Sequence, residues 1–331
     1  MISSPGPADA KRERRTSGLT MVLDRLSGLV ESEFDQASSY VDIVEIGWGL
    51  PLVWREDSII SRVKFYKRHG ISVSLSGTLL EYFFFQNRTD AILDKAQRLG
   101  FDTIEISDGI IDMTKDQKAR IVRAVKSRGL DYLVAVGKKD PATQLSLPET
   151  ISQIGTALAL EPRKVVLEGR ARGRDVGIYD SEGEIRWNLL RAITDAFDHR
   201  DLVFEAPLEN QQDALIAEFG PDVNLGNVAL ASIASLQSER LGLRFETFRV
   251  KRSKEPLSGG PSVKFVLFVI RHYQPIDQRG IAAASQLPRR TIQKAVEYLL
   301  LHKLITEHSS FEDGRSKIYR TPSVSLMDRA R

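Results

Sequence analysis

The sequence contains no cysteine, which excludes disulfide bonds, thiolate nucleophiles and cysteine-ligated zinc. No apolar run approaches the roughly 18 residues that a membrane span requires. The five histidines show no ligand spacing, and the first predicted strand is not followed by a glycine-rich phosphate turn. A metal site in this protein would therefore depend on oxygen ligands, which favours magnesium over zinc or copper.

The composition is that of an ordinary folded protein, with 42% hydrophobic and 27% charged residues. A chain of 331 residues can bury a large core and still carry a second, smaller domain. Residues 1–16 are basic and lack the apolar segment of a secretory signal. We interpret them as a disordered leader, and we expect a cytoplasmic protein that does not contact a membrane.

The net charge of +3 conceals an uneven distribution along the chain. Residues 251–331 contain 15 Lys and Arg against 7 Asp and Glu, a net charge of +8, and the preceding residues carry −5. A basic tail on an acidic body predicts a module that binds a polyanion, attached to a domain with another task. The alternative is a small domain whose surface is simply basic.

Short apolar segments alternate with amphipathic helical stretches between residues 18 and 249. Eight strands joined by helices over about 230 residues are typical of a parallel barrel, so we predict an α/β fold with a TIM-type (β/α)8 barrel over 17–249. An open doubly wound sheet is the alternative fold. The predicted strands lie within 20–25, 41–49, 71–77, 103–109, 131–139, 202–207 and 223–228, and at the start of 164–180.

Acidic and basic side chains follow the ends of several predicted strands, where the active site of such a barrel lies. If Ile104 and Ile106 face the helices, Glu105 faces the barrel interior. The same alternation places four more carboxylates inside, and the five together would repel one another unless cations offset them. These four carboxylates are Asp24, Glu45, Glu168 and Glu205, and the expected cations are Lys138, Lys139, Arg170 and a magnesium ion.

Single residues of this kind also have ordinary structural explanations. A lone strand-end glutamate often caps a loop or forms an ion pair, and Lys138 with Lys139 could be a solvated pair. Gly226 and Asn227 could form a simple turn, although the loop after the eighth strand of a barrel often binds phosphate through backbone amides. The prediction of a site therefore rests on convergence, since so many polar residues fall at strand ends.

The barrel region contains eight distinctive segments in order, namely RTSGLTMVLD, DIVEIGWG, SGTLLE, FDTIEISDG, VGKKDP, VVLEGRARGRDVGIYD, VFEAPLENQQ and FGPDVNLGNV. Together they resemble phosphosulfolactate synthase, a β/α-barrel enzyme on the route to coenzyme M. The resemblance covers roughly residues 15–249. It implies magnesium-dependent addition of sulfite to phosphoenolpyruvate, which is a carbon–sulfur lyase reaction. Of the two small anionic substrates, one carries a phosphate group.

The resemblance also implies roles for individual residues. Lys138, in the Gly-Lys-Lys segment of the family, is the expected proton donor or phosphate partner. We also expect a homo-oligomer. The implied catalytic residues are Lys138, Glu105, Glu168 and Arg170; the implied metal ligands are Asp108, Glu168 and Glu205; and the implied substrate contacts are Lys139, Gly226, Asn227, Trp48 and Glu45.

Position 45 departs from the family pattern. The family has a lysine there, in Lys-x-Gly-Trp-Gly-Thr, whereas this chain has Glu45. An inward glutamate beside two anionic substrates could lower their affinity by orders of magnitude. Two function hypotheses follow. We place first a synthase-like lyase, because Lys138 and the Glu168-Gly169-Arg170 segment are retained; the alternative is an altered barrel acting as a metabolite-sensing transcriptional regulator.

The residues after the barrel predict a second module. Residues 250–260 have the composition of a linker, and 323–331 form a tail. Residues 261–322 predict an apolar helix, two helices around a turn at Leu287-Pro288, and a hairpin with Asp313-Gly314 at its turn. This order resembles a winged helix-turn-helix, which implies duplex DNA as a partner; dimerisation or protein contact is the alternative. The implied DNA contacts are Arg289, Arg290, Thr291, Gln293, Arg315 and Lys317.

Overall fold

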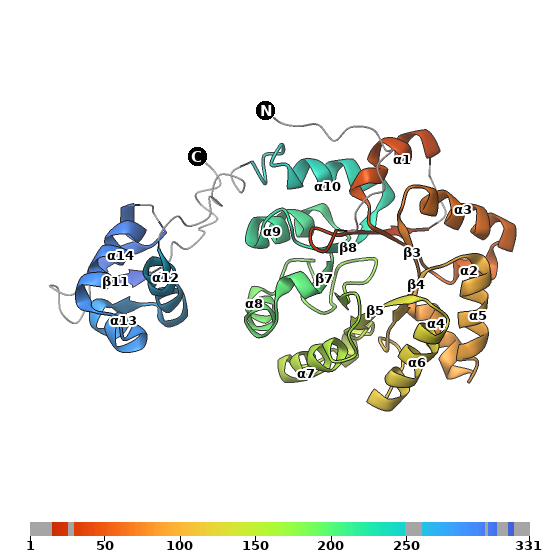
Figure 1. Cartoon of the computed structure of the whole chain (residues 1–331), viewed down its shortest axis with the longest axis horizontal. Coiled ribbons are helices and arrows are strands. Elements are labelled where there is room, and N and C mark those ends of the chain that lie inside the picture. Colours follow the sequence, from red (N-terminus) through yellow and green to blue (C-terminus); the bar gives the residue numbers. More distant parts are fainter. Residues whose placement is uncertain (1–14, 26–29, 249–259, 302–303, 310–316, 321–331) are drawn as a thin grey trace. The chain divides into compact units, whose positions relative to one another are not determined.

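The computed structural model describes residues 15–25, 30–248, 260–301, 304–309 and 317–320. The chain forms two compact units, residues 1–253 and 254–331 (Figure 1). Most of the predicted leader and linker, and the whole predicted tail, lie outside the described residues. Arg15, at the end of the predicted leader, is described, and its guanidinium pairs with the Asp42 carboxylate at 2.7 Å.

The first unit is a closed barrel of eight parallel strands in sequence order, which confirms the predicted barrel. Every strand is rich in aliphatic residues, because its inner face packs in the barrel and its outer face packs against helices. The strands are β1 (Thr20–Asp24), β2 (Ile43–Ile46), β3 (Ser72–Leu75), β4 (Thr103–Ile106), β5 (Asp131–Val136), β6 (Val165–Leu167), β7 (Leu202–Glu205) and β8 (Leu225–Ala229).

Helices surround the barrel and lie between its strands in the chain (Figure 1). Local signals set several of their ends: Thr114 and Gln117 form a capping box at the start of α6, and Gly100 ends α5 in the left-handed region. The sequence did not predict α4, whose apolar residues lack helical alternation. The helices are α1 (Glu31–Ala37), α2 (Leu50–Val53), α3 (Glu56–Arg68), α4 (Gly77–Phe85), α5 (Thr89–Leu99), α6 (Lys115–Ser127), α7 (Leu147–Leu158), α8 (Trp187–Ala196), α9 (Glu209–Phe219) and α10 (Ile233–Arg240).

The barrel has two apolar regions. The larger one lies between the strands and the helices. The smaller one lies inside the barrel, where two side chains of β5 meet one each from β1, β2, β6 and β7. The inner cluster consists of Met21, Ile43, Leu133, Ala135, Val166 and Val203.

In its described residues, the second unit combines three helices with a small antiparallel sheet of order β10-β11-β9. Its core includes Val266, Ile270, Ile281, Ile292 and Tyr319, and all five are at most 2% exposed. The turn predicted at Asp313-Gly314 lies outside the described residues. The elements are α12 (Pro261–Tyr273), β9 (Ile276–Asp277), α13 (Gln278–Ser285), α14 (Arg289–Leu301), β10 (Thr306–Ser309) and β11 (Lys317–Arg320).

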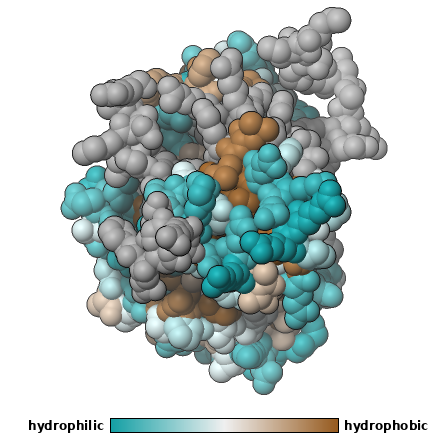
Figure 2. Space-filling view, turned by 90° about the vertical axis from the view of Figure 1, so that its left-hand side faces the viewer, coloured by the Kyte–Doolittle hydropathy of each residue, from teal (hydrophilic) through white to brown (hydrophobic). Residues whose placement is uncertain are grey.

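Figure 2 shows one face, on which hydrophilic residues predominate around smaller hydrophobic patches. None of the described helices combines the length and the hydrophobicity that a membrane crossing needs.

Candidate active site at the barrel mouth

Four glutamates lie inside the barrel at the carboxyl ends of its strands. Glu45, Glu105 and Glu205 belong to β2, β4 and β7, and Glu168 directly follows β6. All four are at most 8% exposed. The strand register explains the inward direction: Glu105 pairs with Leu133, which belongs to the inner apolar cluster. The site therefore collects carboxylates from four separate parts of the chain.

Asp24 is a carboxylate whose predicted direction is wrong. In the register between β1 and β2, Leu23 pairs with Glu45, so Leu23 takes the inward position and Asp24 the outward one. Asp24 instead meets α3, where Arg62 Nε lies 2.9 Å from its carboxylate and Tyr66 donates a 2.7 Å hydrogen bond. A buried acid can face the helix layer when that layer provides a cation and a hydroxyl.

Glycines beside the glutamates make room for them. A Cβ on Gly77 would lie 2.7 Å from Glu105 Oε1, and one on Gly137 would lie 2.8 Å from Glu168 Cβ. Gly137 also has a φ of +129°, which side chains rarely allow. The Gly77 amide donates a 3.2 Å hydrogen bond to Glu105 Oε1. The glycines that follow the strands thus provide space for the carboxylates and, at Gly77, a donor.

Backbone amides orient two of the carboxylates. Glu205 Oε2 accepts hydrogen bonds from the amides of Gly169 and Arg170, at 2.7 and 3.1 Å. Glu168 Oε1 accepts from the same Arg170 amide at 2.9 Å. Arg170 has a φ of 55°, so the loop turns sharply just after Glu168. Arg170 therefore meets the carboxylates through its main chain, whereas the sequence suggested its guanidinium as the contributing group.

A lysine also lies among the glutamates, and it is Lys139. Its Nζ lies 3.1 Å from Glu168 Oε2 and donates a 2.9 Å hydrogen bond to Thr78 Oγ1. The position follows from alternation in β5, because Leu133 and Ala135 face inward. Continued past the strand, the same alternation brings Lys139 to the inner side.

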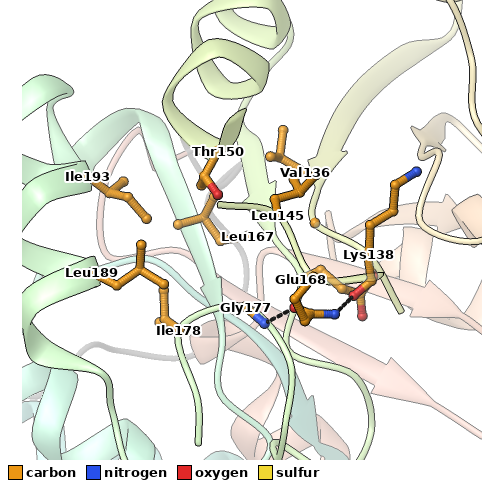
Figure 3. Close-up of a pocket in the computed structure, with 12 residues that line it drawn as sticks. Val136, Lys138, Leu145, Thr150, Leu167, Glu168, Gly177, Ile178, Leu189 and Ile193 are labelled. Atoms are coloured by element: carbon orange, nitrogen blue, oxygen red, sulfur yellow. Dashed lines mark hydrogen bonds between the residues drawn. The ribbon is translucent and has the colours of Figure 1, made fainter. Parts of the chain in front are cut away.

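Lys138 takes the opposite direction. Its Nζ donates to the Asp108 backbone oxygen at 2.7 Å and pairs with the Asp112 carboxylate at 2.8 Å. In Figure 3 the Lys138 side chain extends away from Glu168. The structure therefore brings Lys139 into the group of carboxylates and leaves Lys138 at its edge.

Charge in the interior is unbalanced, with four carboxyl groups around the Lys139 ammonium. Burial, followed by the charge of Glu205, raises the pKa of Glu45 to about 7, although Lys139 and a hydrogen bond with Ser76 act in the other direction. Burial and neighbouring glutamates raise the pKa of Glu105 and of Glu205 well above its usual range. Burial lowers the pKa of Lys139, but the glutamates outweigh it and raise that pKa above its ordinary value. The site thus favours bound protons or an added cation.

In the barrel interior, two buried oxygens, Glu105 Oε2 and Asn227 Oδ1, have no hydrogen-bond partner within the described residues. The register between β1 and β8 shifts near Asn227, which has a φ of 55°. Leu225 and Val228 both belong to the outer core, so the two residues between them, Gly226 and Asn227, are turned to the interior. An unsatisfied buried acceptor costs about 1–3 kcal/mol, so these oxygens indicate a site for a cation or a donor group.

Two other predicted site residues lie outside the group of glutamates. Asp108 forms a 2.7 Å ion pair with Lys118 of α6, and both side chains are nearly buried. Trp48 is 60% exposed, and the Arg25 guanidinium lies 4.4 Å from its ring centroid. Asp108 therefore fixes the loop after β4 to a helix, and Trp48 lies at the surface near the end of β1.

Glu81, a buried glutamate of α4, was not predicted from the sequence. Its carboxylate accepts hydrogen bonds from the Ser107 hydroxyl and from the amides of Ile110 and Ile111, the latter two at 2.7 and 3.0 Å. It therefore anchors the loop that follows Glu105. A single acid within the apolar run GTLLEYFFF was the signal that could have identified it.

A small cavity lies behind Glu168 (Figure 3). Gln144 joins the two loops beside it, since it accepts from the Gly177 amide at 2.7 Å and donates to the Lys138 backbone oxygen at 2.8 Å. The cavity volume is about 30 Å³, which leaves room for one or two water molecules but not for a substrate. Most of its wall is apolar, including Val136, Leu145, Leu167, Ile178, Leu189 and Ile193.

The interior oxygens are suited to magnesium, which typically takes one or two carboxylates and completes its shell with water and substrate oxygens. Within the described residues, the group of three acids whose ligand atoms lie within 4.8 Å of one another is elsewhere, at Asp213, Glu239 and Glu246. Arg244 Nε lies 2.6 Å from Glu239 in that group, so a cation is already present there. The interior glutamates could therefore supply a pair of ligands but not a closed three-acid site.

Comparison with known proteins identifies the family of the barrel. Residues 8–246 match the family model described as (2R)-phospho-3-sulfolactate synthase (ComA). The chain belongs to the phosphosulfolactate synthase family. The phosphosulfolactate synthase of Methanocaldococcus jannaschii is 37% identical over 237 residues, covering 70% of this chain and 94% of the relative. That of Bacillus subtilis is 33% identical over 215 residues, covering 64% and 84%. The family match ends before the second unit begins.

Proposed function

We propose that the barrel is a lyase that adds sulfite to phosphoenolpyruvate, and that the second unit binds duplex DNA. The observation that carries the first part is the Lys139 ammonium among four buried glutamates at the mouth of a barrel of this family. These groups lie where β/α barrels place their catalytic residues.

The proposed reaction forms one carbon–sulfur bond. The sulfur lone pair of sulfite attacks the methylene carbon of phosphoenolpyruvate, and the double-bond electrons move to the adjacent carbon and its carboxylate. The intermediate is an aci-anion, with negative charge delocalised over that carboxylate. A proton then adds to the carbon that bears the phosphate, which gives phosphosulfolactate. Catalysis therefore requires positive charge near the carboxylate and a proton donor near the adjacent carbon.

We propose that Lys139 provides both the positive charge near the substrate carboxylate and the proton for the adjacent carbon. Its side chain is 22% exposed, so its charge acts in a partly dry environment, and the surrounding carboxylates keep it protonated. The sequence assigned the proton-donor role to Lys138, but Asp108 and Asp112 engage that amine. Glu168 positions Lys139 through the 3.1 Å ion pair.

Magnesium is the proposed cofactor. Glu205 and the unpartnered oxygens of Glu105 and Asn227 are the groups that would hold it, whereas Glu168 already pairs with Lys139. When bound, the ion supplies positive charge that stabilises the developing aci-anion. Asp108 is not among the proposed ligands, because Lys118 already pairs with it.

Glu45 favours a second candidate function. It is 8% exposed and adds a fourth acid to the interior, where the family pattern has a lysine. Sulfite and phosphoenolpyruvate are both anions, so Glu45 opposes their binding. The second candidate is a barrel that binds a metabolite without turning it over and thereby controls the DNA-binding unit.

We infer a winged helix-turn-helix in the second unit from its α12-β9-α13-α14-β10-β11 order and its antiparallel sheet. Arg289, Arg290 and Gln293 on α14 are exposed, Thr291 is half-buried, and Lys317 lies on β11. Arg315 lies outside the described residues. The net charge of +8 over residues 251–331 supports a polyanionic partner.

The decisive experiment mixes purified full-length protein with magnesium, phosphoenolpyruvate and sulfite, and measures product mass. We expect a mass equal to the sum of phosphoenolpyruvate and hydrogen sulfite, absent when sulfite is omitted. An inactive wild type that still binds phosphoenolpyruvate, together with an active Glu45→Lys variant, would favour the second candidate.

A further inference from the structure

In a helix-turn-helix the second helix, here α14, enters the major groove of duplex DNA. We propose that Arg279 and Arg289 hold one of the two flanking DNA backbones in a groove beside α14, and that Arg290 and Lys294 hold the other backbone in a second groove. This inference rests on the DNA-binding function proposed above, and it assigns a role to Arg279 and Lys294.

The first groove lies between α13, α14 and β11 and has a volume of about 400 Å³. Arg279, Arg289 and Lys317 line it. The guanidinium groups of Arg279 and Arg289 are exposed and form no ion pair or hydrogen bond within the described residues. The Lys317 ammonium, in contrast, lies 2.5 Å from the Glu307 carboxylate. Asp277 also lines the groove, but its carboxylate caps α13 by accepting from a backbone amide at 2.7 Å. Two guanidinium groups are therefore available to an anion.

The floor of this groove is less polar than its rim. Ala282, Ile292 and Tyr319 line it, and the Tyr319 hydroxyl accepts a 3.1 Å hydrogen bond from Gln278. A deoxyribose can pack against such a floor while its phosphate accepts hydrogen bonds from the guanidinium groups. The groove thus matches a sugar–phosphate unit better than it matches a free inorganic anion, which has no apolar part.

The second groove lies on the other side of α14, beside the start of α12, and has a volume of about 550 Å³. Arg290 and Lys294 line it, one helical turn apart. Both are exposed, and neither has an ion pair within the part of the chain that the structure describes. Arg289 and Arg290, which are adjacent at the start of α14, therefore line different grooves.

This arrangement fits the dimensions of B-form DNA. The major groove is about 12 Å wide and admits a helix of about 10–12 Å diameter, with a phosphate backbone on each side. Cations at the two edges of α14 would meet these two backbones. Gln293 is exposed one turn after Arg289, where it would face base edges, and glutamine pairs best with adenine there.

The test uses the full chain and short fluorescent duplexes of mixed sequence. Affinity is measured by anisotropy over a series of salt concentrations. Arg279→Ala and Arg289→Ala should each lower the slope of log affinity against log salt by about one, because each removes a phosphate contact. Arg271→Ala is the matched control, since Arg271 is exposed on α12 outside both grooves, and it should leave the slope nearly unchanged. Gln293→Ala should keep the slope and alter sequence preference.

The possible outcomes distinguish a wrong groove assignment from the absence of DNA binding. A wild-type chain without salt-dependent affinity for duplex DNA would refute DNA binding as a whole. Wild-type binding whose slope falls equally in Arg271→Ala and Arg279→Ala would overturn the assigned groove and leave DNA binding intact. A slope that falls only in the groove variants supports the assignment.

Discussion

The barrel buries its key charges, whereas the second unit exposes them. Inside the barrel, four glutamates with at most 8% exposure surround Lys139, and desolvation raises the pKa of Glu45, Glu105 and Glu205. On the second unit, Arg279, Arg289, Arg290 and Lys294 are exposed and lack ion pairs within the described residues. Buried charges are little screened by salt and respond to pH, and exposed charges are screened by salt. The two units should therefore respond to different perturbations.

The largest expected effect is the loss of Lys139. Lys139→Ala should lower the rate of adduct formation by a factor of about 100 or more, because both charge stabilisation and proton donation are lost. Lys138→Ala is the matched control and should retain activity within a few-fold, since that amine is engaged by the loop after β4. Steady-state rates of both variants provide the measurement. A larger loss in Lys138→Ala would restore the role that the sequence assigned to it.

Stability should fall as pH rises from 4.5 to about 7 in metal-free buffer. The folded state keeps a proton on Glu45 throughout this range, because its pKa is raised from 4.5 to about 7, whereas the unfolded chain has lost it. Glu45 alone should reduce the free energy of unfolding by about 3 kcal/mol across the range. Urea denaturation at several pH values measures this slope. Glu45→Gln should make it shallower without abolishing it, because Glu105 and Glu205 also have raised pKa values, and an unchanged slope would contradict the raised pKa of Glu45.

Reversing the charge at position 45 should improve substrate binding. Above about pH 7, where Glu45 is mainly ionised, Glu45→Lys changes the interior by two charge units, so the KM for phosphoenolpyruvate should fall by about tenfold or more. Glu45→Gln should give roughly half of that free-energy change, which makes the two variants a graded series. Identical KM values across the series would show that Glu45 does not oppose the substrate. DNA affinity measured without metabolite should be the same in all three proteins.

The smallest effect is expected for a paired cation of the second unit. Lys317 lies 2.5 Å from Glu307, so Lys317→Ala should lower the salt slope of DNA binding by clearly less than Arg279→Ala. Glu307→Gln should raise DNA affinity a few-fold, because it frees the lysine for a phosphate. Anisotropy at one low salt concentration suffices for this comparison. An equal loss in Lys317→Ala and Arg279→Ala would show that the ion pair with Glu307 does not persist in the complex.

The sequence alone determined the barrel, because each strand and most helices carry a local pattern of apolar residues. It also placed Glu45, Glu105, Glu168 and Glu205 at strand ends, which the structure brings together. Glu81 and helix α4 were missed because an apolar helix without polar alternation has no distinctive period.

Only the tertiary structure decided the direction of particular side chains. Pairing between β1 and β2 turns Asp24 outward, and the register shift beside β8 turns Asn227 inward. These directions depend on register with a neighbouring strand, and the pKa values depend on burial and on charges distant in the chain. Neither quantity is local, so a local sequence pattern could identify the chemical groups but not the way in which they meet.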